Sequence, residues 1–270
     1  MMSTNGQVQA NIRQVPQLEA LPRRVYARSE SLRTAAVTKW HDHPWIQLSY
    51  AIRGVMEVQV ADGRYLAPPQ RAILIPAGLS HRVTSEPDTE MRSLYIRSEE
   101  FPELLARCEI LEVQPLAREL IRTFSTYPED YDENSEEGRL VSVMIDQLRE
   151  APRTDLHLPW PADERLQPMC REIYAHPDHP DTLGDWAQKL GISEKTITRI
   201  FQKETSLAFR AWRQRLRLLS SLPLLERGER VTDIALACGY DSTSAFISAF
   251  RSHFGVTPGG LVSGRSESVA

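Results

Sequence analysis

Short apolar runs separated by turn residues fill the first third of the chain. Between about residues 25 and 97 the runs IQLSYAI, VMEVQV, AILIP and MRSLYI are divided by Gly54, Asp62-Gly63 and Ala77-Gly78. Antiparallel strands give this pattern, because each strand is short and the turns between strands favour glycine and aspartate. The pattern therefore predicts a β-rich domain with closely spaced hairpins.

The spacing of apolar residues becomes helical after Arg97. Two stripes repeat every three to four positions, and their members are Leu116, Leu120, Ile121, Phe124, Leu140, Met144 and Leu148. This period predicts two amphipathic helices after the β domain. They either cover its sheet or pair with a second subunit, and their spacing does not decide between the two.

A proline-containing segment divides the chain. Residues 151–161 have the sequence APRTDLHLPWP, a composition typical of a semi-rigid linker. We expect an N-terminal arm at residues 1–24, the β domain with its two helices at 25–150, a linker at 151–162, an all-helical domain at 163–262 and a tail at 263–270.

Two similar units lie in the helical part. In the first unit, an apolar stripe at residues 183–190 ends at Gly191, and Ser193 is placed to cap a second helix; the second unit repeats this order with Gly239 and Ser242. Glycine ends helices and serine caps them, so each unit predicts a helix-turn-helix. The inward positions of the two second helices are Ile197, Ile200, Phe201, Phe246, Phe250 and Phe254.

The segment between the two units has a length that suits DNA. Residues 208–226 have helical apolar spacing, and a helix of this length spans about 28 Å. Successive major-groove entries on one face of DNA lie about 34 Å apart, so one chain can place two helices in neighbouring grooves. The first outward face carries short polar and cationic side chains that can reach base edges: Glu194, Lys195, Thr198, Arg199 and Gln202.

Charge differs between the two parts of the chain. Residues 1–181 carry a net charge of −8 and residues 182–270 a net charge of +4. A basic excess favours contact with a polyanion. Because no apolar run approaches the ~18 residues that span a bilayer and the first residues lack a secretory pattern, we expect a cytoplasmic protein with no membrane partner. The 3 scattered cysteines predict reduced thiols.

The sequence from TLGDWAQKLGISEKTITRIFQKET through FRAWRQRLRLLSSLPLLERGERVTDIALACGYDSTSAFISAFRSHFGVTP resembles the DNA-binding domain of AraC-type transcription regulators. The resemblance covers nearly all of residues 163–260. It implies double-stranded DNA as a partner, and RNA polymerase as a further partner if the protein activates transcription. We also expect a homodimer, because two subunits would double the DNA site that is read. By position in that motif, base-contacting roles fall on Lys195, Thr198, Arg199, Thr243, Ser244, Ile247 and Ser248.

This chain departs from the AraC pattern in three places. Ser206 stands where glycine is usual, Pro223 lies inside the connecting helix, where it is expected to bend the axis, and GGLVS follows Pro258 where an aromatic residue and an arginine are usual. The second outward face has no cation before Arg251, so we expect the first unit to supply most base specificity and the second to hold phosphates and the groove wall. Four arginines on the connecting helix either clamp phosphates or form a solvated, salt-bridged face: Arg210, Arg213, Arg215 and Arg217.

Three histidines and a glutamine form the motif of the β domain. His41, His43 and Gln47 share strand parity, so we expect their side chains on one face, and His81 follows a turn at Gly78. Over about residues 35–97 this spacing resembles the two motifs of cupin barrels, which AraC-type regulators often carry as a sensor. The resemblance implies a β-barrel or jelly-roll sensor and dimerisation domain at residues 25–150, with these four residues around one pocket.

The chemistry of that pocket is open between three interpretations. The histidines can hold a divalent transition metal, although Gln47 replaces the glutamate usual in metal-binding cupins. They can instead bind a small-molecule effector with Trp45 as an aromatic wall, or satisfy one another and the backbone. We expect no required cofactor and no enzyme activity. The alternative is a metal-dependent cupin enzyme fused to a helical module, against which the missing carboxylate argues.

Overall fold

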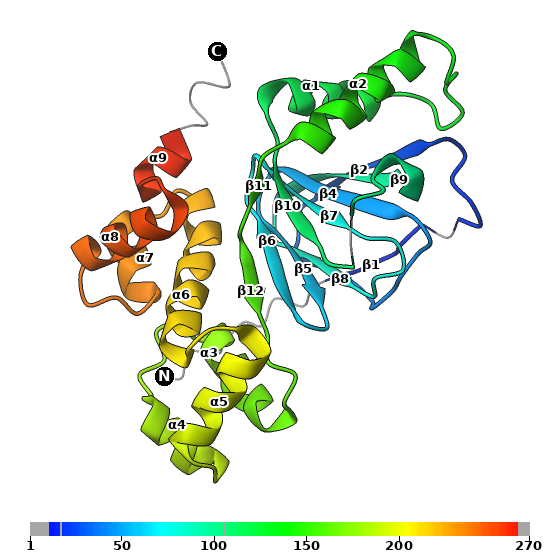
Figure 1. Ribbon diagram of the computed structural model, residues 1–270. Coiled ribbons are helices and arrows are strands. Elements are labelled where there is room, and N and C mark those ends of the chain that lie inside the picture. The colour runs from blue at the N-terminus through cyan, green and yellow to red at the C-terminus, as the bar shows by residue number, and fades with distance from the viewer. Residues whose placement is uncertain (1–10, 17, 105, 264–270) are drawn as a thin grey trace. The chain divides into compact units, whose positions relative to one another are not determined.

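The computed structural model describes residues 11–16, 18–104 and 106–263. The chain divides into two compact units: the first contains the residues up to Val60 and Tyr65–Leu156, and the second contains Ala61–Arg64 and the residues from His157 onward. The first unit is rich in sheet and the second in helix (Figure 1). This confirms the expected two-domain architecture.

Two sheets build the first unit. Sheet A contains, in spatial order, β1 (Asn11–Arg13), β3 (Ala36–Thr38), β8 (Arg82–Ser85), β5 (Met56–Val60) and β6 (Gly63–Ala67). Sheet B contains β11 (Arg153–Thr154), β10 (Glu109–Glu112), β7 (Arg71–Ile75), β4 (Ile46–Arg53), β9 (Thr89–Ile96) and β2 (Val25–Leu32). The β1 strand pairs in parallel with β3, so residues 11–13 of the expected arm are a sheet edge; residues 1–10 lie outside the described residues.

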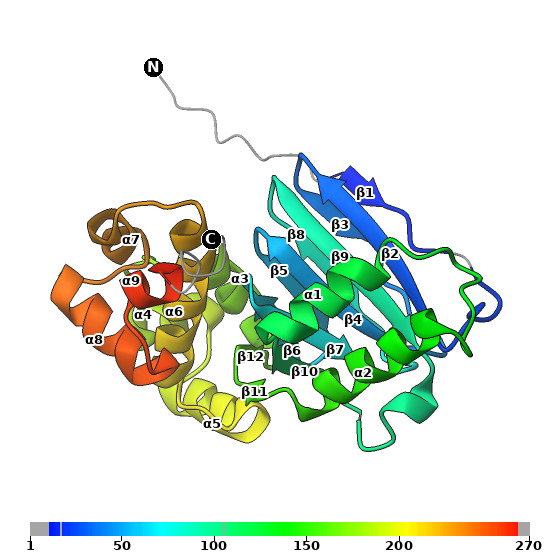
Figure 2. The ribbon, with the colours of Figure 1, turned by 90° about the horizontal axis from the view of Figure 1, so that it is seen from above.

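The helices α1 (Pro115–Phe124) and α2 (Glu136–Glu150) cover one face of sheet B (Figure 2). Ile46, Leu48 and Tyr50 alternate along β4 and share a buried core with Ile121 of α1 and Met144 of α2. Side chains alternate between the two faces of a strand, which explains why the odd-numbered residues of β4 point to the other face. The sequence left open whether these helices cover the sheet or pair with a second subunit, and in the structure they cover the sheet.

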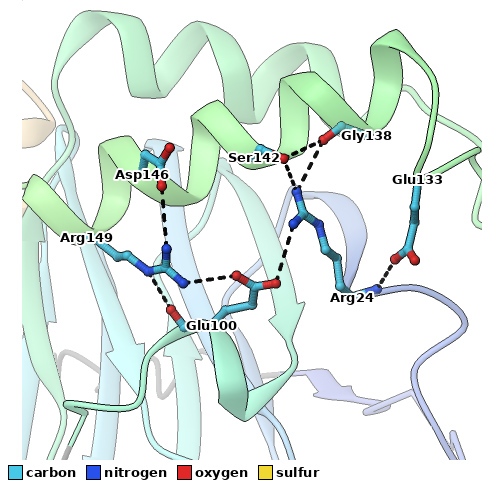
Figure 3. A network of polar contacts seen from close by, with 7 residues as sticks. All are labelled: Arg24, Glu100, Glu133, Gly138, Ser142, Asp146 and Arg149. Atoms are coloured by element: carbon cyan, nitrogen blue, oxygen red, sulfur yellow. Dashed lines mark hydrogen bonds and ion pairs between the residues drawn. The ribbon is translucent and has the colours of Figure 1, made fainter.

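Arg24 and Arg149 hold α2 in place through one carboxylate. Glu100, in the short helix η1 (Ser98–Glu100), pairs with Arg149 Nη2 at 3.1 Å and with Arg24 Nη1 at 3.7 Å (Figure 3). Arg24 also donates to the carbonyl oxygen of Gly138 and to Ser142 Oγ on α2. Because these groups are part-buried, the network fixes α2 more firmly than exposed ion pairs would.

The second unit begins with chain that the sequence predicted to be a linker. After β12 (His157–Pro159), Trp160 packs edge-on against Trp212, whose indole N–H donates to the carbonyl oxygen of Pro159 at 2.7 Å. Trp160 itself donates to Gln167 Oε1 at 2.9 Å. Residues 157–160 are therefore packed chain of the second unit rather than a spacer.

Two helix pairs flank the long helix α6 (Phe209–Glu226) in the second unit (Figure 1). After the short helix η2 (Glu164–Leu166) and α3 (Gln167–Ala175), the first pair is α4 (Leu183–Leu190) with α5 (Glu194–Thr205). The second pair is α7 (Val231–Ala237) with α8 (Thr243–Phe254), followed by α9 (Pro258–Ser263). Pro223 lies inside α6 without ending it. The two expected helix-turn-helix units and the connecting helix are all present.

Candidate functional site

The first recognition helix, α5, is fixed at both ends and along one face. Gly191 ends α4 with φ of 65°, and Ser193 Oγ accepts the backbone N–H of Thr196 at 3.2 Å, which caps α5. Ile197 and Phe201 are 0% exposed, so that face is occupied by the core. The candidate base-contacting residues Lys195, Thr198 and Arg199 are all exposed on the opposite side.

The second recognition helix, α8, follows the same plan with different surface chemistry. Ser242 Oγ accepts the backbone N–H of Ala245 at 3.2 Å, and Phe246 and Phe250 are 0% exposed. Of the four candidate residues on this helix, Thr243 and Ile247 are half-buried, and Ser244 and Ser248 are exposed. The structure thus displays hydroxyl and aliphatic groups here, where α5 displays cations.

The arginines of α6 differ in their surroundings: some bond to neighbouring segments, and Arg210 is exposed. Arg213 Nη1 donates to the carbonyl oxygen of Asp181 at 2.7 Å, and Arg217 Nε donates to that of Pro177 at 2.9 Å. Arg217 also lies against the turn of the second pair, because a Cβ on Gly239 would stand 2.6 Å from its Nη2 atom. These two residues therefore tie α6 to neighbouring segments, whereas Arg210 is exposed.

His41, His43 and His81 meet in the first unit, though by a different local structure from the one expected. The β4 strand begins only at Ile46, so His41 and His43 precede it and strand parity does not position them. Instead, His41 and His81 form a two-way backbone bridge, with N···O distances of 3.0 and 2.9 Å. The Gly78 N–H donates to the carbonyl oxygen of His43 at 2.8 Å and brings the third ring to the same place.

The backbone fixes the tautomer of each imidazole in this histidine cluster. The Nδ1 atoms of His41, His43 and His81 lie 2.9, 2.8 and 2.8 Å from the carbonyl oxygens of Lys39, Trp45 and Leu79. A carbonyl oxygen only accepts, so each Nδ1 carries the proton and each Nε2 keeps a lone pair. One ring nitrogen from each histidine lies within 4.8 Å of the other two, so the Nε2 atoms are the groups that remain for a shared ligand.

Burial lowers the pKa of two of the three histidines in the cluster. His81 is 0% exposed, and burial lowers the pKa of its imidazole to about 3. Burial also lowers the pKa of His41. The Nε2 atom of His81 is buried and has no hydrogen-bond partner among the described residues. A buried acceptor in this state costs free energy, which marks the position as one suited to a ligand.

Gln47 is the fourth residue of the cluster. Its carboxamide contacts His43 Nε2 at 2.9 Å and Ser49 Oγ at 2.8 Å. With the amide nitrogen facing the histidine and the amide oxygen facing the serine, the carboxamide donates to His43 Nε2 and accepts from Ser49 Oγ, because the two ends of a carboxamide are interchangeable in shape. Trp45 stacks on His43 with ring centroids 5.5 Å apart, so the expected aromatic wall lies beside the cluster.

Sequence reasoning missed further polar residues on the same face of sheet B. Ser49 pairs across the strands with Ser93, and Gln47 pairs with Tyr95. Arg13 of β1 donates to Ser93 Oγ at 3.5 Å and forms a part-buried ion pair with Glu30. The alternation of serine and tyrosine along β9 was a usable signal, whereas nothing in the short segment around Arg13 indicated a strand.

No helix in the described part of the chain is long and apolar enough to cross a membrane.

Comparison with known proteins places both units. Residues 25–158 match the AraC-like ligand binding domain, and residues 186–263 match a helix-turn-helix domain. The transcriptional regulator NimR of Escherichia coli is 34% identical over 219 residues, which cover 81% of this chain and 80% of NimR. RipA of Corynebacterium glutamicum is 29% identical over 107 residues, which cover 40% of this chain and 32% of RipA.

Among solved structures, ToxT of Vibrio cholerae aligns with 88% of this chain and 96% of its own, at 12% identity and a TM-score of 0.38. The chain belongs to the AraC family of transcription regulators, with an N-terminal ligand-binding domain and a C-terminal DNA-binding helix-turn-helix domain.

Proposed function

We propose that this regulator binds a two-part DNA site through α5 and α8, and that a transition-metal ion held by His41, His43 and His81 changes its affinity for that site. The observation that carries the second half is the fixed tautomer of all three rings, each with Nδ1 bonded to a backbone carbonyl. Metal-binding histidines characteristically donate their other ring N–H in this way.

The residues fit a metal such as zinc. Each Nε2 keeps the lone pair that a metal needs. Burial lowers the pKa of His81 and so disfavours its protonated form, and the Nε2 atom of His81 has no hydrogen-bond partner among the described residues. Zinc lies about 2.0–2.1 Å from histidine nitrogens, so small rotations of the rings are required to bring their ligand nitrogens, now within 4.8 Å of one another, onto one ion. His43 must also release Gln47. The ion would supply a fixed positive charge that orients the three rings.

A metal test on the full chain separates this proposal from an organic effector. Protein passed through a chelator is titrated with Zn²⁺, and we expect about one ion per chain, lost in His81→Ala and His43→Ala. His176→Ala is the matched control, because His176 is exposed in the second unit. Binding that is equal in all four proteins would contradict the site. No binding at all would leave a small organic molecule as the ligand.

The DNA half is tested by selection from a random pool of duplexes at moderate salt. The expected result is enrichment of one sequence with two separated elements, since two helices joined by α6 read two groove segments. Zn²⁺ is then expected to change the affinity for that sequence by roughly 5- to 150-fold, the usual size of allosteric coupling. An unchanged affinity at saturating Zn²⁺ would contradict metal control, and a pool that never enriches would contradict sequence-specific binding.

Two partners complete the proposal. Two copies of the chain are proposed to act as a homodimer, because a second copy doubles the DNA that is read, and RNA polymerase is the further partner if the regulator activates transcription. Sedimentation equilibrium tests the dimer, and a monomer at the concentration that saturates the operator would contradict it. The named relatives are regulators, which supports a non-catalytic role; small-molecule turnover that disappears in His41→Ala would contradict that role.

A further inference from the structure

The two recognition helices differ in the chemistry they display. Over its first three turns α5 exposes Lys195, Arg199 and Gln202, all of which donate hydrogen bonds. The α8 helix has at corresponding places Ser244, Ser248 and, in its last turn, Arg251. Because Ser193 and Ser242 cap the two helices in the same way, positions counted from these caps can be compared directly.

This difference limits which bases α8 can distinguish. Guanine is read in the major groove by the paired donors of arginine or lysine, and adenine by asparagine or glutamine. None of these residue types stands on α8 before Arg251. What distinguishes thymine is its C5-methyl group, which is recognised by apolar contact. The largest accessible aliphatic side chain on α8 is Ile247; the others, Ala245 and Ala249, carry a single methyl group each.

Ile247 is held in a way that suits such a contact. It lies three residues before the fully buried Phe250 and is itself half-buried, so part of its side chain packs on the unit while the rest is accessible. A β-branched side chain in a helix has essentially one χ1 rotamer, and its apolar surface is therefore displayed at little further entropic cost. Thr243 precedes it by one helical turn and carries a second methyl group on the same side.

We propose that Ile247 reads thymine methyl groups, with support from Thr243, so that the half-site under α8 is specified by T·A pairs while the half-site under α5 is specified by hydrogen bonds. This rests on the proposed DNA binding. It extends the expectation that α8 mainly grips phosphates: the helix also selects sequence, through apolar contact.

The test removes only the methyl group. In the operator selected from the random pool, each thymine is replaced in turn by deoxyuridine, and binding of the full chain is measured at fixed salt. At one or two positions we expect about 4-fold weaker binding, the value of one buried methyl group. In Ile247→Ser, thymine and deoxyuridine at those positions should bind equally. Ile247→Val, which keeps two methyl groups, should still distinguish them and guards against a folding defect in the serine variant.

Three outcomes overturn the proposal without touching DNA binding itself. They are a selected operator whose affinity responds to no deoxyuridine substitution, a deoxyuridine effect that persists unchanged in Ile247→Ser, and a deoxyuridine effect that disappears instead in Thr198→Ala, its counterpart on α5. Failure of the selection to enrich any sequence is a different result, because it removes the DNA-binding proposal on which this one rests.

Discussion

The two units differ in where the polar side chains of their candidate sites lie: outside the core in the second unit and inside it in the first. In the second unit the buried faces of α5 and α8 are apolar, and the polar residues proposed to contact bases lie outward. In the first unit, His43, Gln47, Ser49, His81 and Ser93 are buried on or beside sheet B. Buried polar groups cost free energy unless they are paired, and the proposed ligand site lies among these groups.

The largest expected effect comes from the apolar side of this comparison. Phe250→Ala should destabilise the second unit by about 3–5 kcal/mol, because it empties a fully buried aromatic position. Ser248→Ala, two residues away and exposed, should change stability by less than about 0.5 kcal/mol. Denaturant unfolding of the full chain measures both. Similar losses in the two variants would mean that α8 is not divided into a core face and a free face.

Acid should act on the first unit through His81. Its pKa is about 3 in the folded chain, against 6.5 for the ordinary imidazole, so the unfolded chain binds more protons between these values. The contribution of His81 to the free energy of unfolding is therefore fully present above about pH 6.5. It is lost as the pH drops toward 3, by up to about 1.4 kcal/mol for each pH unit. Metal-free protein melted across this range measures the effect. A slope in His81→Gln as steep as in the parent would contradict it.

The smallest expected effect on stability concerns the residues that end the two recognition helices. Both end in a left-handed residue, which is Ser206 after α5 with φ of 59° and Gly255 after α8 with φ of 75°. Because glycine adopts this conformation without a steric penalty, Ser206→Gly should stabilise the unit by about 0.5–1 kcal/mol, and Gly255→Ala should destabilise it by about 1 kcal/mol. Thermal melting measures both, and a loss in Ser206→Gly would show that the serine side chain has another role.

Most of the second unit could be predicted from its sequence because each element carries its own local signal. Apolar spacing, Gly191 with Ser193, and Gly239 with Ser242 define both helix pairs without reference to distant residues. The glycine expected at Ser206 also has its explanation in the left-handed φ there. Residues 157–160 were misjudged because the prolines of residues 151–161 indicated a linker, whereas the tryptophan contacts that fix this segment are made with distant residues.

The sequence predicted which histidines lie together but not how the chain positions them. His41 and His81 are joined by a bridge across 40 positions of sequence, and His43 is placed by Gly78. Such pairings depend on the sheet as a whole and have no local pattern. The same reason hid Arg13, whose strand exists only because β3 provides an edge for it.

The central claim, that outward residues of the second unit read DNA sequence, is tested most directly by Arg199→Ala. Binding is measured on the selected operator and on random duplex, with Arg171→Ala as a control that removes the same charge from an exposed site on α3. We predict a loss of about 1–3 kcal/mol on the operator, little loss on random duplex, and little effect of Arg171→Ala on either. Equal loss on operator and random duplex would contradict the claim, because Arg199 would then contact only the phosphate backbone.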